Sequence, residues 1–390
     1  MSLSLRVVDN LVIGGGLAGA MAALHLARAG REVILLEKEH AAHHKVCGEF
    51  LSREALSYLE QAGLAPREFG AAEIGIVRLS TGGKVVEAAL PFTALSLSRS
   101  ILDAEMLLRA RRAGCDVRRG IFVEHLEAHD KQWLVRLRGG ESLVAKTVFL
   151  ANGKHDLRGW DRDQGRQGDL VGFKMHCQLT AAQTDALREC MELFLFSGGY
   201  GGLSLVEDDV ANLCLVVRRA ELRKVGAWPE LVASIFSNNA HLRQIMHGSR
   251  ELWERPLAIS SIPYGYLAGR PDGIWCIGDQ AAVIPSFTGD GMSIALHSAA
   301  MAAEMYLSGS TAEKYNRKMH AQLHRGMTLA TWLSKAMVTR TGRGLAPSVL
   351  TLFPHAIRWI ALATRIPERA LLAGPANTDG SRPLRRVHIA

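Results

Sequence analysis

The first forty residues follow the hydrophobic pattern of a strand, a helix and a second strand. Residues 11–13 form an apolar run that ends in a glycine-rich turn at 14–19, and an alanine-rich segment at 18–28 follows it. A second apolar run at 33–36 ends at the carboxylate of Glu37. Short apolar runs on either side of a helical segment are typical of a βαβ unit with two parallel strands. The chain is therefore predicted to begin with a Rossmann-like α/β domain.

The hydrophobic pattern changes several times after this unit. Alternating apolar positions around 81–83 predict a hairpin, whereas 99–112 has the period of a helix. The segment 172–263 alternates again, and from 274 onward a buried strand returns, followed by a helix near Gly291. From these changes we predict a dinucleotide-binding domain in three parts (1–74, 99–171 and 264–325), interleaved with a substrate domain made of a hairpin (75–98) and a β-rich body (172–263), and a helical C-terminal region (326–390).

The C-terminal region is both apolar and basic. The segment 345–366 carries many apolar residues, with Pro347, Pro354 and Arg358 among them. Two interpretations are open: a pair of helices that packs on the body of the protein, or a face that contacts a membrane surface or a hydrophobic substrate. Beyond Gly374 we expect the tail to be frayed.

Composition and charge narrow the class of protein. Of the 390 residues, 48% are hydrophobic and 22% are charged, which is typical of a globular protein. The net charge is +8, but the basic residues are scattered and show no zinc-finger or RNA-binding spacing, so we expect no nucleic-acid partner. The six cysteines lie far apart without a CxxC pair, which predicts a reduced protein with no metal site. No secretory leader and no apolar run of about 18 residues is found, so we expect a cytoplasmic protein, with peripheral membrane contact left open.

The glycine-rich turn has the spacing of a dinucleotide-binding loop. Gly14, Gly16 and Gly19 match GxGxxG, and Glu37 follows Gly19 by 18 residues at a strand end. Gly14 permits the tight turn, Gly16 lets a pyrophosphate approach the backbone, and Gly19 lets helix and strand pack closely. The helix N-terminus attracts the phosphates, and Glu37 accepts hydrogen bonds from a ribose diol, which disfavours a 2′-phosphate. The sequence thus predicts FAD or NAD rather than NADP, with a glycine turn that binds no ligand as the alternative.

Two later motifs choose between these cofactors. Gly278-Asp279 ends an apolar strand, and the string 285–292 (PSFTGDGM) precedes a predicted helix. Together with the element 99–103 (RSILD), they make the chain resemble, from about Leu11 to Leu323, the FAD-dependent oxidoreductase superfamily of aromatic hydroxylases (group A flavin monooxygenases) and geranylgeranyl reductases.

The resemblance implies non-covalent FAD and assigns roles to several residues. Asp279 would contact the ribityl or pyrophosphate region, although an ordinary helix N-cap is the alternative for this carboxylate. Arg99 would lie near the FAD phosphates. The residues expected beside the isoalloxazine ring are Pro285, Gly289, Gly291 and Met292. A helix that begins near Gly291 would direct its N–H groups toward the ring and stabilise negative charge on the reduced flavin.

A further string resembles the geranylgeranyl-reductase branch in particular. Lys45-Val46-Cys47-Gly48 is similar to the Lys-x-Cys-Gly segment that passes near the flavin there. Lys45 and Gly48 are accordingly predicted as cofactor-binding residues, since Gly48 allows close backbone approach. Cys47 is included with them, either as a buried apolar side chain or as a thiol that touches substrate or flavin.

The chain also departs from its relatives. Asn152 stands where the aromatic hydroxylases carry the acid of an Asp-Gly motif. The Tyr-x-Trp-x-Phe-Pro motif of the geranylgeranyl reductases is replaced by a glycine-rich stretch at 200–204, and the halogenase string Trp-x-Trp-x-Ile-Pro is missing. Halogenation is therefore not expected, and a prenyl chain would be bound differently.

Three functions compete at this point. The first is a monooxygenase that is reduced by NAD(P)H and hydroxylates an aromatic, quinone-like or polyketide-type substrate through a flavin C4a-hydroperoxide. The second is a reductase that transfers hydride from the flavin to an alkene or quinone, and the third is a flavin-binding protein without turnover. No catalytic acid or base can be assigned.

The expected substrate is a small hydrophobic or aromatic molecule. Phe196, Tyr200 and Tyr264 are the candidate substrate residues, because aromatic side chains line apolar pockets and a phenol can orient an oxygenated ring. Plain core packing is the alternative for each of them.

Overall fold

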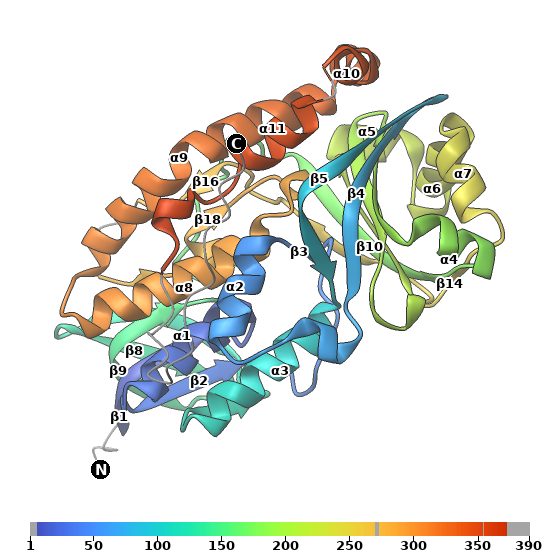
Figure 1. Ribbon diagram of the computed structural model, residues 1–390. Coiled ribbons are helices and arrows are strands. Elements are labelled where there is room, and N and C mark those ends of the chain that lie inside the picture. The colour runs from blue at the N-terminus through green and yellow to red at the C-terminus, as the bar shows by residue number, and fades with distance from the viewer. Residues whose placement is uncertain (1–5, 270–272, 354, 373–390) are drawn as a thin grey trace, which may run out of the picture.

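A computed structural model describes residues 6–269, 273–353 and 355–372, so the predicted fraying beyond Gly374 lies outside the described residues. The described chain forms two large sheets, a small two-stranded sheet and layers of helices around them (Figure 1). The expected α/β fold with a Rossmann-like domain and C-terminal helices is confirmed.

The first sheet has the strand order β6-β2-β1-β9-β8-β7, and β17 pairs with β9. Its strands are β1 (Arg6–Ile13), β2 (Val33–Glu37), β6 (Asp116–Arg119), β7 (Val123–His129), β8 (Gln132–Leu137), β9 (Ser142–Leu150) and β17 (Trp275–Cys276). The pairs β6–β2, β2–β1, β1–β9 and β9–β17 are parallel, and β7 and β8 add an antiparallel hairpin. The central strands are apolar because they are buried inside the domain, with α1 packed against β1, β2 and β9.

Helices α1 (Leu17–Arg28), α2 (Arg53–Gln61), α3 (Arg99–Arg112) and α8 (Gly291–Leu307) belong to this domain. Almost every side chain of α1 is buried, as its alanine-rich sequence requires, because α1 lies between the sheet, α3 and α8. The predicted helix 99–112 is confirmed at both ends. Its start is set by Ser98, whose hydroxyl accepts the Ile101 N–H (3.4 Å) as an N-cap.

The second sheet has the strand order β14-β10-β13-β12-β11-β4-β5-β3, and β15 pairs with β10. Its strands are β3 (Phe50–Leu51), β4 (Ala72–Thr81), β5 (Lys84–Ser96), β10 (Leu170–Gln178), β11 (Glu189–Phe196), β12 (Gly199–Leu205), β13 (Ala211–Arg218), β14 (Arg250–Glu251) and β15 (Leu257–Ser260). The hairpin β4–β5 turns at residues 81–84, where two glycines permit the reversal. The parallel pair β11–β4 joins this hairpin to the rest of the sheet.

The segment 172–263 also contains helices that its alternating pattern did not indicate. They are α4 (Ala181–Leu187), α5 (Arg219–Val225), α6 (Trp228–Asn238) and α7 (Ala240–Met246). The apolar cluster of the sheet includes Trp228, Leu231 and Leu242 from these helices. One face of the sheet is therefore covered by helices, and the opposite face is left to meet the rest of the molecule.

The C-terminal region forms α9 (Ala312–Met337), α10 (Arg340–Leu352) and α11 (His355–Ala363), which lie along one side of the molecule (Figure 1). Helix α11 packs against β5, and α10 contacts α9 and the β4–β5 hairpin. The remaining elements are β16 (Tyr266–Leu267), β18 (Ala282–Val283) and the short 3-10 turns η1 (Pro66–Phe69), η2 (Glu207–Asp209), η3 (Gly278–Gln280), η4 (Ser286–Thr288) and η5 (Glu368–Ala370). The C-terminal helices thus bridge the two domains.

Candidate active site

A cavity of about 1350 Å³ extends between the two sheets and beneath the C-terminal helices. Most of the predicted site residues line it: Gly14, Gly16, Glu37, Lys45, Cys47, Gly48, Arg99, Tyr200, Tyr264, Asp279, Gly289, Gly291 and Met292. Three predicted residues, Gly19, Pro285 and Phe196, are not among the lining residues. The cavity brings together motifs from the whole length of the chain.

The glycine loop at one end of the cavity is shaped for close approach of a ligand. Gly14 has φ +107°, which favours glycine, and a Cβ on Gly19 would lie 1.8 Å from the Gly14 carbonyl oxygen. Gly19 therefore serves helix–strand packing rather than ligand contact. A Cβ on Gly16 would instead meet only the flexible ends of Lys45 (3.4 Å) and Arg99 (3.5 Å), together with Asp103 Oδ2 (4.0 Å). The space beside Gly16 is thus open toward charged groups.

The N-terminus of α1 supplies hydrogen-bond donors at this end of the cavity. Its N-cap is Gly16, which has no side chain to accept a hydrogen bond, and the first turn contains no acidic residue. The first N–H groups of a helix have no partner within the helix and carry partial positive charge. An anionic group such as a pyrophosphate would satisfy them.

Glu37 is buried at the end of β2 and is held in place by the backbone. The Gly15 N–H donates to Glu37 Oε2 (2.7 Å), and the Glu39 N–H donates to Oε1 (2.9 Å). A carboxylate offers about four lone-pair positions, so both oxygens can accept further hydrogen bonds. The carboxylate is consequently fixed at the cavity wall in a position suited to bind a diol.

A cluster of charges lies next to the glycine loop. Arg99 pairs with Asp103 (Nε to Oδ1, 2.8 Å), and Lys45 Nζ also reaches Asp103 (2.8 Å). Burial alone would raise the pKa of Asp103, but Arg99 and Lys45 outweigh it and hold that pKa below its usual value. The carboxylate fixes two cations whose combined charge exceeds its own, and an excess of positive charge beside open N–H groups favours phosphate.

The second glycine turn precedes α8. Gly289 has φ +72°, and the N-cap of α8 at Asp290 provides no side-chain hydrogen bond, so the N–H groups of Gly291 and Met292 remain available to a ligand. Pro285 sits at the start of η4, where it shapes the loop without lining the cavity. The turn therefore presents backbone donors, rather than a charged side chain, to the cavity.

Asp279 lies in η3 rather than at the start of α8, so it does not cap that helix. Its carboxylate is 3.8 Å from Lys154 Nζ, and Arg162 Nη1 donates to its carbonyl oxygen (2.8 Å). Gly278, with φ +62°, turns the backbone so that Asp279 faces the cavity. Asn152, at the position of the relatives' acid, donates to the His155 carbonyl oxygen and also lines the cavity.

A buried charge network that was not predicted from the sequence lies at the turn before α8. Arg365 Nη1 donates to Asp290 Oδ1 (2.8 Å) and to Glu54 Oε2 (3.1 Å), and all three side chains are buried. Burial raises the pKa of Asp290 to about 7, because the attraction of Arg365 only partly offsets it and Glu54 adds repulsion. The partners lie 75 and 311 residues from Arg365, so no local pattern signals the contact.

A second network lies beneath the Lys45–Gly48 string. The Glu49 side chain accepts hydrogen bonds from Lys174 Nζ, His176 Nε2 (3.2 Å) and the Arg99 N–H (2.8 Å), while Glu49 and Lys174 are fully buried. Burial would raise the pKa of Glu49, but His176 and Lys174 hold it below its usual value.

Donor atoms of His44, Glu49 and His176 lie within 4.8 Å of one another, which is a spacing compatible with a metal ion. The Lys174 ammonium already pairs with Glu49, however, and its charge opposes a second cation. We therefore assign this cluster as an ion-pair network that anchors the loop after β2, where Glu49 has a φ of 58°.

Two tyrosines face each other at the other end of the cavity. Tyr200 on β12 approaches Ser334 Oγ of α9 (3.3 Å), and its ring packs edge to face against Phe287 (centroids 5.9 Å apart). Burial raises the pKa of Tyr200, and polar contacts with Ser334, Ser286 and Tyr264 offset this only in part. Burial, with the neighbouring Tyr200, raises the pKa of Tyr264 well above its usual value. Both phenols therefore stay protonated and act as hydrogen-bond donors.

Phe196 does not belong to this site, and the expectation that it contacts the substrate was wrong. It packs on Phe194 (centroids 6.1 Å apart) in the core between the sheet and its covering helices. Phe196 pairs with Gly199 and Leu195 with Tyr200 across a two-residue turn. Residues paired directly across strands share a face, so Tyr200 and Phe196 point to opposite faces of the sheet.

The rest of this end of the cavity is apolar. The side chains come from both sheets and from the C-terminal helices: Val77, Leu79, Leu90, Met191, Leu193, Val216, Ile259, Ile262, Met337, Ile357 and Ile360. Cys47 and Cys214 line the same region, and Asn212 Nδ2 donates to the Cys47 carbonyl oxygen (3.2 Å). An apolar lining with a few convergent polar groups is typical of a small-molecule site.

The residues at the two ends fit a dinucleotide that carries a planar ring. Open N–H groups, the Lys45–Arg99 cations and Glu37 match a pyrophosphate and a ribose, whereas the α8 turn and the apolar wall match a ring and its substrate.

Comparisons with known proteins agree with this interpretation. Residues 7–149 match the family model described as an FAD binding domain. The chain is 27% identical to digeranylgeranylglycerophospholipid reductase 1 of Methanothermobacter thermautotrophicus, over 75% of each chain. It is 25% identical to menaquinone reductase of Mycobacterium tuberculosis, over 84% of this chain and 83% of the relative. Among solved structures, the flavin-dependent brominase Bmp2 is similar in fold, with a TM-score of 0.74 and 16% identity over 91% of this chain and 94% of that one.

Proposed function

We propose that the chain is a monooxygenase among the FAD-dependent oxidoreductases, a superfamily that includes the aromatic hydroxylases and the geranylgeranyl reductases, and that it hydroxylates an oxygenated aromatic substrate with an apolar portion. Bound FAD would supply the electron transfer and the activation of dioxygen, and NAD(P)H would be the external reductant. The protein's own residues bind and orient the substrate and keep water from it.

The observation that supports this proposal is the pair of phenols at the apolar end of the cavity. Tyr200 and Tyr264 are buried, protonated donors on either side of Ser286, which belongs to the turn before α8. Hydroxyl groups in an apolar pocket favour a substrate that carries oxygen, because an oxygen atom can exchange hydrogen bonds with them and a hydrocarbon cannot. A phenol or a quinone-like ring offers such oxygens, whereas a simple hydrocarbon does not.

The apolar wall supports the same chemistry in a second way. Side chains from β4, β11 and α11 enclose the region beside the phenols and would exclude water from a bound substrate. Exclusion of water prevents side reactions of the reactive intermediates of a hydroxylation. The wall extends well beyond the two phenols, so the substrate is expected to carry an apolar group in addition to its ring.

Reduction of an alkene or quinone is the second candidate. Two relatives that align with most of this chain carry the names of reductases, and the Lys45–Gly48 string resembles one of those branches. The same phenols would then bind a quinone carbonyl oxygen. The two candidates share the site and differ in whether oxygen is consumed.

The experiment that separates them follows dioxygen and product together. FAD-loaded protein, NAD(P)H and a panel of alkylated phenols, quinones and polyprenyl compounds are incubated in isotopically heavy dioxygen, and products are analysed by mass spectrometry. A heavy oxygen atom in the product supports the monooxygenase. A product that gains two hydrogen atoms and also forms under anaerobic conditions supports the reductase. If the bound flavin shows no turnover with any reductant and any compound of the panel, both the monooxygenase and the reductase are contradicted.

A further inference from the structure

The C-terminal helices carry most of the exposed apolar side chains of the described residues. Seven of the ten large hydrophobic side chains that are exposed there lie on or next to α9, α10 and α11: Trp332, Leu345, Val349, Leu352, Phe353, Trp359 and Leu362. We call these seven residues the C-terminal apolar face. Leu352, Trp332, Phe353 and Trp359 are each at least 60% exposed, although such side chains are normally buried. A group of this size marks an interaction surface.

The same segment carries a one-sided charge. Between residues 332 and 362, which span the C-terminal apolar face, the sequence contains four Lys and Arg and no Asp or Glu, while the whole chain has a net charge of +8. Lys335, Arg340 and Arg358 are exposed beside the apolar side chains. Helices with exposed aromatic and leucine side chains and basic neighbours are typical of proteins that lie on an anionic membrane surface.

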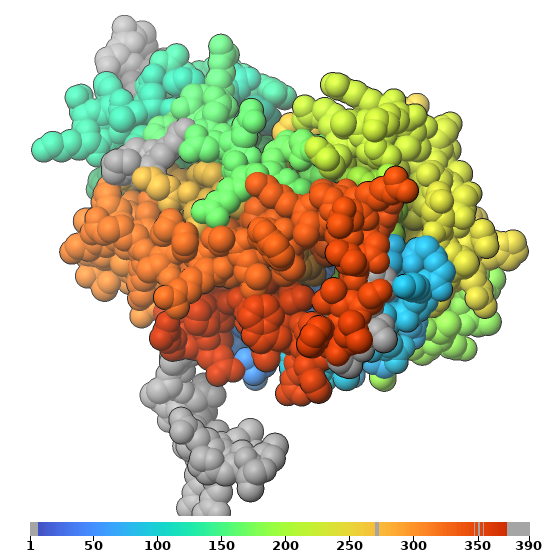
Figure 2. Space-filling view, turned by 90° about the horizontal axis from the view of Figure 1, so that it is seen from above, coloured from blue at the N-terminus to red at the C-terminus, as the bar shows by residue number. Residues whose placement is uncertain are grey.

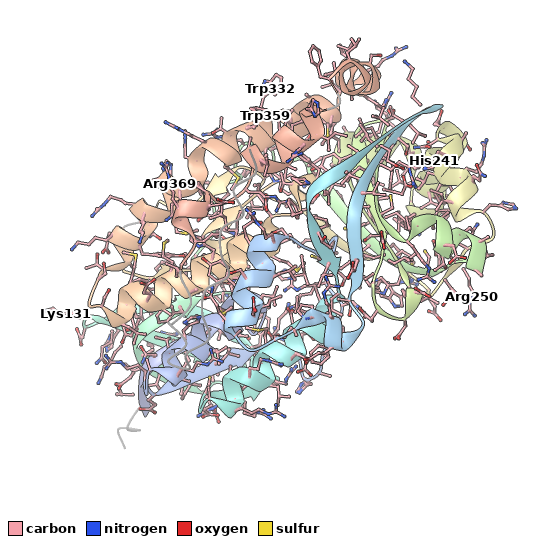
Figure 3. All side chains as sticks on the ribbon, viewed as in Figure 1. Lys131, His241, Arg250, Trp332, Trp359 and Arg369 are labelled. Carbon is pink, nitrogen blue, oxygen red and sulfur yellow. The ribbon has the colours of Figure 1, made fainter. Side chains whose placement is uncertain are left out.

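The figures place these helices together on one side of the molecule. Seen from above, α9, α10 and α11 occupy a continuous area that faces the viewer (Figure 2). Trp332 and Trp359 lie on the same upper side of the molecule as α10 (Figure 3). No helix among the described residues is long and apolar enough to cross a bilayer.

The apolar face is separated from the cavity by one layer of helix. Leu333 of α9 and Ile360 of α11 line the cavity, and their sequence neighbours Trp332 and Trp359 are exposed on the outside. A surface that sinks into the outer part of a bilayer would thus bring lipid within one helix of the substrate region.

We propose that the C-terminal apolar face docks the protein on an anionic phospholipid bilayer. A second copy of the chain is the less suitable occupant, because a two-fold dimer would place the same face of each copy together and bring the positive charges of one face against those of the other. The docking is independent of which reaction the flavin site performs, and it is tested without turnover.

The test uses the full-length, FAD-loaded protein and vesicle flotation. Vesicles of phosphatidylcholine alone are compared with vesicles that contain phosphatidylglycerol, at low and high salt. We expect binding to the anionic vesicles, at least about tenfold weaker binding to the neutral ones, and a decrease with salt, because exposed charges are screened. No flotation with anionic vesicles would overturn the proposal.

Matched variants locate the surface. The triple variant Leu352→Ser, Phe353→Ser, Trp359→Ser removes apolar side chains from the face, and the control Val7→Ser, Leu252→Ser removes exposed apolar side chains from elsewhere. We expect about a tenfold or greater loss of vesicle binding in the triple variant and none in the control, with flavin content and melting temperature equal to wild type in both. Equal binding by wild type and triple variant overturns the proposal. So does a concentration-dependent dimer, seen by sedimentation, that the triple variant abolishes while vesicles bind neither protein.

Discussion

The two ends of the cavity are built in different ways. The cofactor end consists mainly of backbone: the glycine loop, the N-terminus of α1 and the turn before α8, each contained in a short stretch of sequence. The substrate end consists of side chains from β4, β11, β12, β13, β15, α9 and α11, which are scattered over the chain. Backbone N–H groups bind the phosphates of any suitable dinucleotide, and side-chain substitutions do not remove them. The side chains of the substrate end, in contrast, can each be changed by a single substitution. The difference predicts a generic cofactor site and a specialised substrate site.

Gly16→Val should break the cofactor end with the largest effect. The new side chain would occupy the open space beside Lys45 and Arg99 where the pyrophosphate is expected, and we expect FAD content to fall to less than about a tenth of wild type. Gly16 has φ −73°, so valine introduces no backbone strain, and the melting temperature of the cofactor-free protein should be nearly unchanged. Flavin absorbance after reconstitution measures the FAD content. Gly83→Val in the exposed β4–β5 turn is the control, and full FAD retention by Gly16→Val would show that the loop is only a turn.

Asp290→Asn should change the pH dependence of stability at the turn where the two ends of the cavity meet. The folded pKa of Asp290 is about 7 against a usual value of 3.8, so burial disfavours its charged form. Its contribution to stability is complete below about pH 4 and is lost as the pH rises through about 7. The variant does not titrate there, and its unfolding free energy should lack a fall on the order of 2–4 kcal/mol between those pH values. Urea unfolding at several pH values measures the unfolding free energy of both proteins. If that free energy changes with pH equally in wild type and variant, the assignment is contradicted.

Glu37→Ala should weaken the cofactor end without destroying it. The expected loss of FAD affinity is roughly 1–3 kcal/mol, the usual cost of losing a charge-assisted hydrogen bond. Because Glu37 also accepts the N–H groups of Gly15 and Glu39, a modest loss of stability should accompany it. Glu37→Gln keeps one acceptor oxygen but sets an NH2 group against one of the two backbone N–H groups, so it should also lower both quantities. Titration of cofactor-free protein with FAD measures the affinity, and an unchanged dissociation constant would remove Glu37 from the site.

Tyr200→Phe and Tyr264→Phe should alter only the substrate end. Each substitution removes one hydroxyl from the cavity. The expected fall in kcat/KM corresponds to a loss of about 0.5–1.5 kcal/mol of transition-state stabilisation, and the FAD content should be unchanged. Phe196→Leu is the matched control, because Phe196 lies on the opposite face of the sheet and should lower stability without changing substrate preference. Steady-state kinetics with an oxygenated substrate and its deoxy analogue make the measurement. If both tyrosine variants keep the full preference for the oxygenated substrate, the phenols do not bind it.

The features of the cofactor end could be predicted from the sequence, because its motifs are local. A glycine loop between a strand and a helix, an acid at the next strand end and a glycine turn before a helix each require only neighbouring residues. The helix 99–112 followed from its period for the same reason. Local hydrogen bonding and steric rules suffice to place such features.

The substrate end and the charge networks could not be predicted from the sequence, because they depend on how distant elements pack. Arg365 meets Asp290 and Glu54 because α11 packs on β5 and near the α8 turn, and Glu49 meets Lys174 because the loop after β2 crosses the second sheet. The opposite orientations of Phe196 and Tyr200 depend on the register of a two-residue hairpin, in which a shift of one residue would exchange the faces. Contacts between residues far apart in sequence arise from packing of whole elements, and no local pattern encodes which elements will meet.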